Sequence, residues 1–188
     1  MLPTPAMQDT SEQSDEHHHN RRTLKIVSLK LLARCLVYGD AEKNTSYISA
    51  EHYQQLVGSV PREMRALIDK QNEEKTYNKL VAFERPSVNN FIYRLLNYTH
   101  PYFSIPLLSQ NIKVARLGNS DMIEIAYSSN DPGIAYNTLD ILNEEFVKQY
   151  HELRYGETDN VIKFFQEELA RLGKNADLCR GLFNRIQH

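Results

Sequence analysis

The stretch SSNDPGIAYNTLDILNEEF, residues 128–146, contains the side chains whose types and spacing come closest to a binding chemistry. Polar and turn-forming residues from Ser128 to Gly133 run directly into an amphipathic helical pattern. Free backbone N–H groups at a helix N-terminus can bind an anion such as phosphate. The same junction is also typical of a capped helix, with Asn130 or Asp131 as the cap and Pro132 at the first helical position.

Two features of this junction favour the cap over the anion site. A phosphate-binding loop has several glycines and usually a lysine, as in G-x-x-x-x-G-K-[ST], whereas this stretch has Gly133 alone. Asp131 is itself an anion, at the position that a phosphate would occupy. We therefore predict a structural cap, and a small anion-binding domain that uses the Ser128–Gly133 turn is kept as an alternative.

Metal and redox patterns are weak in this sequence. Cys35 and Cys179 lie far apart and form no C-x-x-C pair, which argues against a disulfide framework or a zinc site. Three adjacent histidines, residues 17–19, have no partner ligands at metal-binding spacing, so a solvated tail is expected there. We predict no metal and no cofactor.

Paired carboxylates are the remaining candidates for catalysis, and they favour no enzyme. The glutamate pairs at 144–145 and 167–168 lie in helical sequence, where neighbouring side chains point about 100° apart. Such pairs make no acid–base couple and predict a solvated, outward helix face. No Ser/His/Asp or Cys/His arrangement is evident along the chain, and we predict no catalytic residue.

The composition excludes several classes of protein. The chain has 188 residues, of which 41% are hydrophobic and 24% charged, as in a soluble globular domain. Its net charge of -2 argues against a broad nucleic-acid-binding surface. No apolar run reaches the roughly 18 residues of a membrane helix, and residues 1–22 lack the apolar core of a signal peptide.

Periodicity predicts an α+β fold with several short helices, a small antiparallel β-hairpin and one long C-terminal helix. We expect a disordered polar tail over 1–22, a base domain of helices and hairpin over 23–155, and a protruding part of the long helix over 156–188. Thr23 is predicted to start the first helix, and Ser49 and Ser87 to cap later ones. Pro61 is predicted to start another.

The predicted hairpin joins residues 112–117 to residues 122–128, because both runs are short, β-branched and alternating. Ile123, Ile125 and Tyr127 are expected to face the core, and Glu124 the opposite way. A lone hairpin is marginally stable in water, so it must lean on the preceding helices and leave an edge unpaired.

The long helix carries an apolar stripe too long for the core of one small domain. Its residues recur at helical spacing: Leu139, Leu142, Phe146, Tyr150, Leu153, Val161, Phe165, Leu169 and Leu172. The elements predicted elsewhere in the chain can cover only the N-terminal part of this stripe. We therefore predict that Val161, Phe165, Leu169 and Leu172 drive self-association into a homo-oligomer.

The run from Arg116 to Leu172 resembles the chain-length-determinant family, the polysaccharide co-polymerases of Wzz type found in Bacteroides-like bacteria. The resemblance rests on the strand MIEIAYSS followed by a DP pair and an alanine one turn into a long helix. The residues that match are Asn119, Ser120, Asp121, Asp131, Pro132 and Ala135.

This resemblance implies a non-enzymatic protein at the periplasmic face of the inner membrane. Members oligomerise and regulate the chain length of O-antigen, capsule or exopolysaccharide, with a polysaccharide polymerase and the nascent polysaccharide as partners. Both membrane helices of the family are missing here, so any membrane contact would come through anchors outside this sequence. Relatives carry a tyrosine autokinase, and an extracytoplasmic regulatory fragment of such a kinase is the second alternative.

Overall fold

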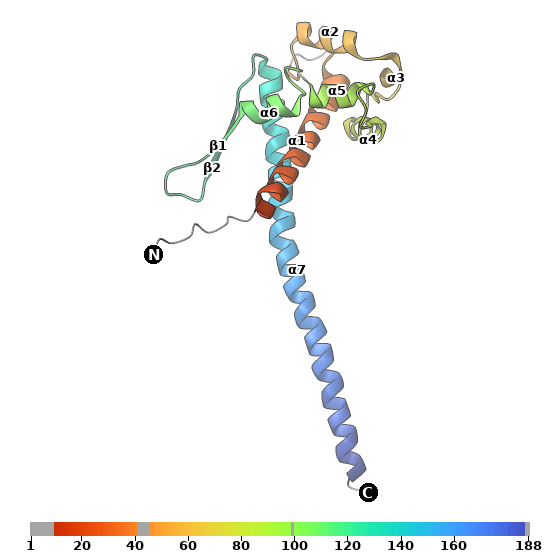
Figure 1. The fold of residues 1–188 in the computed structure, drawn as a ribbon, viewed down its shortest axis with the longest axis vertical. Helices are drawn as coiled ribbons and strands as arrows, with labels where there is room; N and C mark the ends of the chain where they lie inside the picture. The colour runs from red at the N-terminus through yellow and green to blue at the C-terminus, as the bar shows by residue number, and fades with distance from the viewer. Residues whose placement is uncertain (1–9, 41–45, 99, 187–188) are drawn as a thin grey trace, which may run out of the picture. The chain divides into compact units, whose positions relative to one another are not determined.

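The computed structural model describes residues 10–40, 46–98 and 100–186. Side chains of residues 10–19, 153, 157–160, 169–170 and 172–186 lie outside this description. The described part is α+β, as predicted, with a two-stranded antiparallel sheet among its helices (Figure 1). The chain divides into two compact units, Met1–Glu145 and Phe146–His188. This division falls earlier than the predicted one after residue 155.

Helix α1 spans Thr10–Tyr38 and begins well before the predicted start at Thr23. Residues 10–22 are therefore helical, and the prediction of a disordered tail over them is wrong. No proline or glycine interrupts the chain between Thr10 and Tyr38, and glutamate, glutamine and arginine are good helix formers. The helix therefore extends backwards from its apolar half. The first nine residues of the predicted tail lie outside the described residues.

The core of the first unit surrounds the second half of α1. Around it lie α2 (Ala50–Ser59), α3 (Arg62–Arg65), α4 (Glu73–Phe83), α5 (Phe91–Asn97) and α6 (Ile105–Asn111), as Figure 1 shows. Because other elements cover α1 on most sides, apolar residues outside the predicted stripe are buried as well. The fully buried side chains include Leu29, Leu31, Leu32, Leu36, Ile48, Met64, Leu80, Ile92, Leu96, Phe103, Leu108 and Ile134.

Of the three starts predicted for the short helices after α1, two are placed correctly. Ser49 is the N-cap residue of α2, and Pro61 directly precedes α3. Ser87 does not cap α5, because its backbone carbonyl instead accepts the N–H of Asn90 in a tight turn. Asn90 is the cap, and its side chain accepts the N–H of Tyr93 at 3.0 Å.

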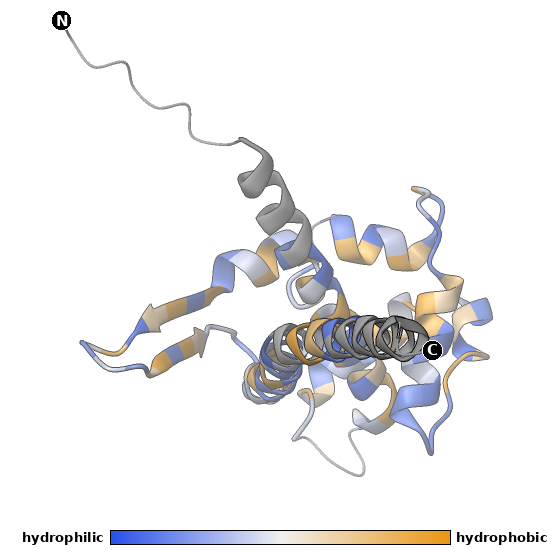
Figure 2. Cartoon of the chain, turned by 90° about the horizontal axis from the view of Figure 1, so that it is seen from below, coloured by the Kyte–Doolittle hydropathy of each residue, from blue (hydrophilic) through white to orange (hydrophobic). Residues whose placement is uncertain are grey.

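The predicted hairpin is confirmed, with β1 at Ile112–Arg116 and β2 at Ile123–Tyr127. Its expected inward face is only partly right, because Tyr127 is buried while Ile123 is 46% exposed. The helices cover the end of the hairpin nearest α6 and leave the rest open. Figure 2 shows hydrophobic and hydrophilic residues alternating along the strands.

Helix α7 spans Pro132–Ile186 and continues through Gly156 without a break. Its first turns belong to the first unit, where Ile134 and Ile141 are buried in the core. The remainder of the helix forms the second unit. None of the helices in the described residues has both the length and the hydropathy that a membrane span needs.

Candidate functional site

The Ser128–Gly133 turn forms the N-terminus of α7, and Asp131 is its cap. The Oδ1 atom of Asp131 accepts the N–H of Ile134 at 3.2 Å, and its carbonyl accepts the N–H of Ala135 at 2.9 Å. Pro132 occupies the first helical position. A negative charge at this position also interacts favourably with the positive end of the helix dipole. The predicted cap is therefore confirmed.

Asp131 has a second role that the sequence did not indicate. Its Oδ2 atom accepts the backbone N–H of Ser49 at 2.9 Å and lies 2.7 Å from Nδ1 of His52. The residue is 1% exposed. One carboxylate thus joins the start of α2 to the start of α7, and its two oxygens already receive the donors that an anion would need.

We refer to Ser49, His52, Tyr102, Asn130 and Asp131 as the Asp131 cluster. The hydroxyl of Ser49 lies 2.8 Å from Nδ1 of His52, and that of Tyr102 lies 3.0 Å from Nε2. Tyr102 donates to the side-chain oxygen of Asn130 at 2.9 Å. Three separated segments of the chain therefore meet around one imidazole ring.

The geometry of the Asp131 cluster differs from that of a hydrolytic triad. In a triad the acid holds Nδ1 and the nucleophile faces Nε2. Here Ser49 and Asp131 share Nδ1, which must carry a proton in order to donate to the carboxylate. A protonated Nδ1 cannot accept the proton of Ser49. These side chains therefore fasten two helix starts together and provide no activated serine.

The charge state of Asp131 fits this fastening role. Burial alone would raise its pKa, but hydrogen bonds from His52 and from the backbone N–H groups of Ser49 and Ile134 outweigh burial and hold the pKa below the usual value. Burial and the nearby Asp131 carboxylate raise the pKa of Tyr102. The carboxylate is therefore ionised and the phenol neutral at physiological pH.

A second set of charges joins α7 to α1 and α4. Arg34 on α1 donates to Asp140 at 2.6 Å and to Glu73 at 3.1 Å. Lys30 lies 2.7 Å from Glu145, whose side chain is almost fully buried. The prediction that the glutamate pair at 144–145 faces solvent is therefore wrong for Glu145. Glu145 is buried because Lys30 on α1 pairs with its carboxylate, and local sequence cannot show a partner so far away in the chain.

The other predicted site residues fall into two places. Asn119, Ser120 and Asp121 form the loop of the hairpin, where the Ser120 hydroxyl donates to the carbonyl of Leu117 and Asp121 lies 3.3 Å from Arg116. Val161 and Phe165 lie on the second unit and are 53% and 59% exposed. Leu169 and Leu172 are helical, and their side chains lie outside the described residues.

A shallow cavity of about 300 Å³ lies beside α5, at the lower end of the size range of ligand pockets. Its lining is mainly apolar and comprises Ser59, Phe91, Arg94, Leu95, Tyr98 and His100. Nδ1 of His100 accepts the backbone N–H of Tyr102 at 3.2 Å, which requires that nitrogen to be unprotonated. No group of metal-binding side chains was found among the described residues.

His100 should make the first unit sensitive to mild acid. Burial lowers its pKa to about 4 from an ordinary 6.5. The folded chain then binds fewer protons than the unfolded chain below pH 6.5, so stability falls as pH drops from about 6.5 to about 4. Linkage gives roughly 3 kcal/mol, and because the ring is partly exposed we expect a loss of about 2 kcal/mol.

Urea unfolding at several pH values measures this loss. His100→Asn keeps an acceptor for the N–H of Tyr102 and should flatten the pH dependence between about pH 6.5 and pH 4. His151→Asn, on an exposed part of α7, is the matched control and should leave the wild-type dependence unchanged. An equally steep loss in His100→Asn would contradict the assignment.

Comparison with known proteins identifies no family for this chain. The chain matches no protein-family model, no curated protein and no solved structure.

Proposed function

We propose that this chain is a non-enzymatic assembly module that acts by self-association through the exposed face of α7 in the second unit. The observation that carries the proposal is a run of large apolar side chains that remain open to solvent on this helix. They include Phe146, Tyr150, Val161, Phe164 and Phe165. Large apolar side chains that gather on the exposed side of one helix mark an interaction surface.

These side chains lie on one side of the helix. At about 100° per residue, the five residues just named fall within an arc of about 100°. Tyr155 and Ile162 are also exposed and lie outside this arc. Polar residues occupy the opposite side, among them Lys148, Glu152, Lys163 and Gln166. Arg154, Glu157 and Glu168 fall within the apolar arc, so the apolar side has two parts, one at Phe146 and Tyr150 and one at residues 161–165. Each part can pack against a helix of another copy.

The free energy available from burying this face is sufficient for assembly. A large apolar side chain contributes about 1.5–3 kcal/mol when it passes from full exposure to full burial. Val161 and Phe165 retain about half of their exposure, so burial of five such residues recovers roughly 4–7 kcal/mol per chain. Ring contacts such as the stacked pair Phe146 and Tyr150 pre-order part of the surface.

The resemblance to chain-length determinants gives this assembly a biological role. Within the proposal, the oligomer regulates the chain length of a bacterial surface polysaccharide at the periplasmic face of the inner membrane. Its partners are the polysaccharide polymerase and the growing polysaccharide. The Asp131 cluster fastens the starts of α2 and α7 together, which supports a structural role for this region, and the chain would act by shape and association.

The double variant Val161→Ser/Phe165→Ser tests this proposal. We expect sedimentation velocity to show that the variant loses the concentration-dependent association of the wild type, because two central apolar side chains become polar. Circular dichroism should show that its helix content is retained, since both positions are exposed.

The matched control changes two residues on the opposite side of the same helical turns, Lys163→Ser/Gln166→Ser. This control should associate as the wild type does. Equal association of both double variants and the wild type would contradict the proposal, as would a wild type that is monomeric throughout.

A further inference from the structure

The hairpin β1–β2 presents a second unpartnered surface, separate from α7. Its cross-strand pairs place Val114 opposite Ile125 and Arg116 opposite Ile123, so these side chains share one face of the sheet. Val114 is 63% exposed and Ile123 is 46% exposed. A two-stranded sheet with an open apolar face is marginally stable in water and gains from further strands.

The hydrogen-bond register shows which backbone groups are free. The N–H of Leu117 donates to Met122 and the N–H of Ser128 donates to Asn111, which fixes these as hydrogen-bonded pairs. Bonded and non-bonded pairs alternate in an antiparallel ladder. The N–H and C=O groups of Ile123, Ile125 and Tyr127 on β2 therefore point away from β1, as do those of Ile112, Val114 and Arg116 on β1.

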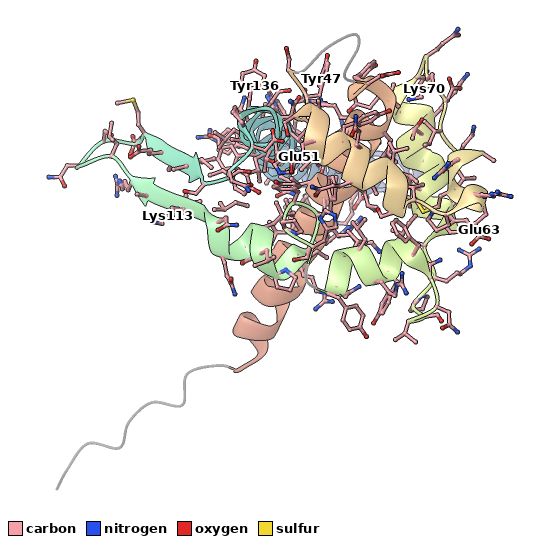
Figure 3. All side chains as sticks on the ribbon, turned by 90° about the horizontal axis from the view of Figure 1, so that it is seen from above. Tyr47, Glu51, Glu63, Lys70, Lys113 and Tyr136 are labelled. Carbon is pink, nitrogen blue, oxygen red and sulfur yellow. The ribbon has the colours of Figure 1, made fainter. Side chains whose placement is uncertain are left out.

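The two free edges differ in their charges. Strand β1 carries Lys113 and Arg116, and positive side chains on an edge strand oppose pairing with another strand. Figure 3 shows the Lys113 side chain on β1. Strand β2 has the sequence IEIAY, with Glu124 as its single charge. The residues whose backbone groups point outward are Ile123, Ile125 and Tyr127, and only Tyr127 is buried. β2 is thus the unprotected edge.

We infer that β2 binds β2 of a second copy of this chain, antiparallel and centred on Ile125. Ile125 then lies opposite its own counterpart, and Ile123 lies opposite Tyr127 of the other copy. Glu124 lies opposite Ala126, so no like charges are directly opposed. The same arrangement through β1 would gather four positive side chains on adjacent strands, which disfavours it.

This pairing makes a closed two-fold dimer with a four-stranded antiparallel sheet. The interface uses the same edge on both copies, so it does not propagate into a filament. It satisfies the free backbone groups of β2 and extends the apolar face across both hairpins. It is independent of the α7 face, and a chain that uses both surfaces forms assemblies larger than a dimer.

Disulfide trapping tests the inferred pairing in the full-length chain. Glu124 and Ala126 of the two copies would form a non-hydrogen-bonded pair, with Cα atoms about 4.5 Å apart and within disulfide range. Glu124→Cys and Ala126→Cys are made separately, both with Cys179→Ser, while Cys35 stays because it is fully buried. Both carry Val161→Ser/Phe165→Ser, so that the α7 face makes no contribution.

Mixing the two cysteine variants under mild oxidation should give a covalent dimer in high yield, and each variant alone should give little. The matched control uses Lys113→Cys and Ala115→Cys, which would be opposite each other only if β1 paired with β1. That mixture should stay monomeric. A covalent dimer from the β1 mixture, or none from the β2 mixture, would overturn the inference.

Proline substitution gives a second readout. Ile125→Pro removes only an outward N–H, so the β1–β2 ladder is kept while the edge is blocked. Trapping through positions 124 and 126 should fall at least about tenfold in Ile125→Pro and be unchanged in Val114→Pro, which blocks the other edge. Equal trapping in both proline variants would also overturn the inference.

Discussion

Replacing Asp131 with alanine is expected to destabilise the first unit by about 3–5 kcal/mol, because a helix cap is lost and buried donors are left without an acceptor. The change removes the cap of α7, and it leaves the N–H of Ser49 and the ring of His52 without their acceptor. The cap alone would cost about 0.5–2 kcal/mol. The donors of Ser49 and His52, which are left without an acceptor, account for the larger expected value.

Urea unfolding followed by circular dichroism measures this change. Asp131→Asn, which keeps a side-chain oxygen for the N–H of Ile134 and loses the charge, should fall between alanine and the wild type. Asp121→Ala is the control, since its ion pair with Arg116 is exposed and should matter by less than about 0.5 kcal/mol. A loss of less than about 2 kcal/mol in Asp131→Ala would show that the carboxylate acts as a cap alone.

The Asp131 carboxylate also predicts how the stability of the first unit changes in strong acid. The pKa of Asp131 is lowered on folding, so its contribution to stability is present above the ordinary value of 3.8. It is lost as pH falls through the lower folded value. As pH falls, this loss of stability comes after the loss caused by His100. It should be absent in Asp131→Ala.

Replacing Gly133 with alanine is expected to destabilise the first unit by about 1–3 kcal/mol, the usual cost of overpacking. An added Cβ would lie 2.6 Å from the carbonyl carbon of Tyr47 and 2.7 Å from the backbone nitrogen of Ile48. These are backbone atoms, which cannot rotate away. Figure 3 shows the side chains of Tyr47 and Tyr136 in this region.

The control for this variant is Gly156→Ala, on the same helix but with no atom within 4 Å of an added Cβ. Alanine is better than glycine in a helix by about 1 kcal/mol, so Gly156→Ala should raise helix content or thermal stability slightly. The two variants should therefore change stability in opposite directions. A stabilised Gly133→Ala would contradict the close packing of α7 against residues 47–48.

Local sequence predicted the helices and strands of this fold better than the contacts between them. Alternation gave both strands, and the Asp131–Pro132 pair gave the start of α7, because these depend on neighbouring residues. The Asp131–His52 and Lys30–Glu145 pairs join residues far apart in the chain, and no spacing rule could show them. The exposure of Ile123 was missed for the same reason, since alternation identifies an apolar face and not what covers it.

The start of α1 shows a different limit. Residues 10–22 are polar, and their composition favours a tail when they are considered alone. A helix already formed by the buried residues after Val27 extends at low cost into any neighbouring segment without breakers, because nucleation is the costly step. The apolar half of α1 thus determines the structure of the polar half.

Residue-resolved NMR on dilution tests the central claim, that the chain assembles through the α7 face, most directly. Between about 500 and 10 µM, in the range where weak self-association is populated, the amide signals of residues 146–171 should shift or sharpen together. Signals from α2, α4 and α5 should stay constant, because those helices belong to the first unit and the α7 face belongs to the second. Signals from residues 146–171 that do not change with concentration would contradict the account.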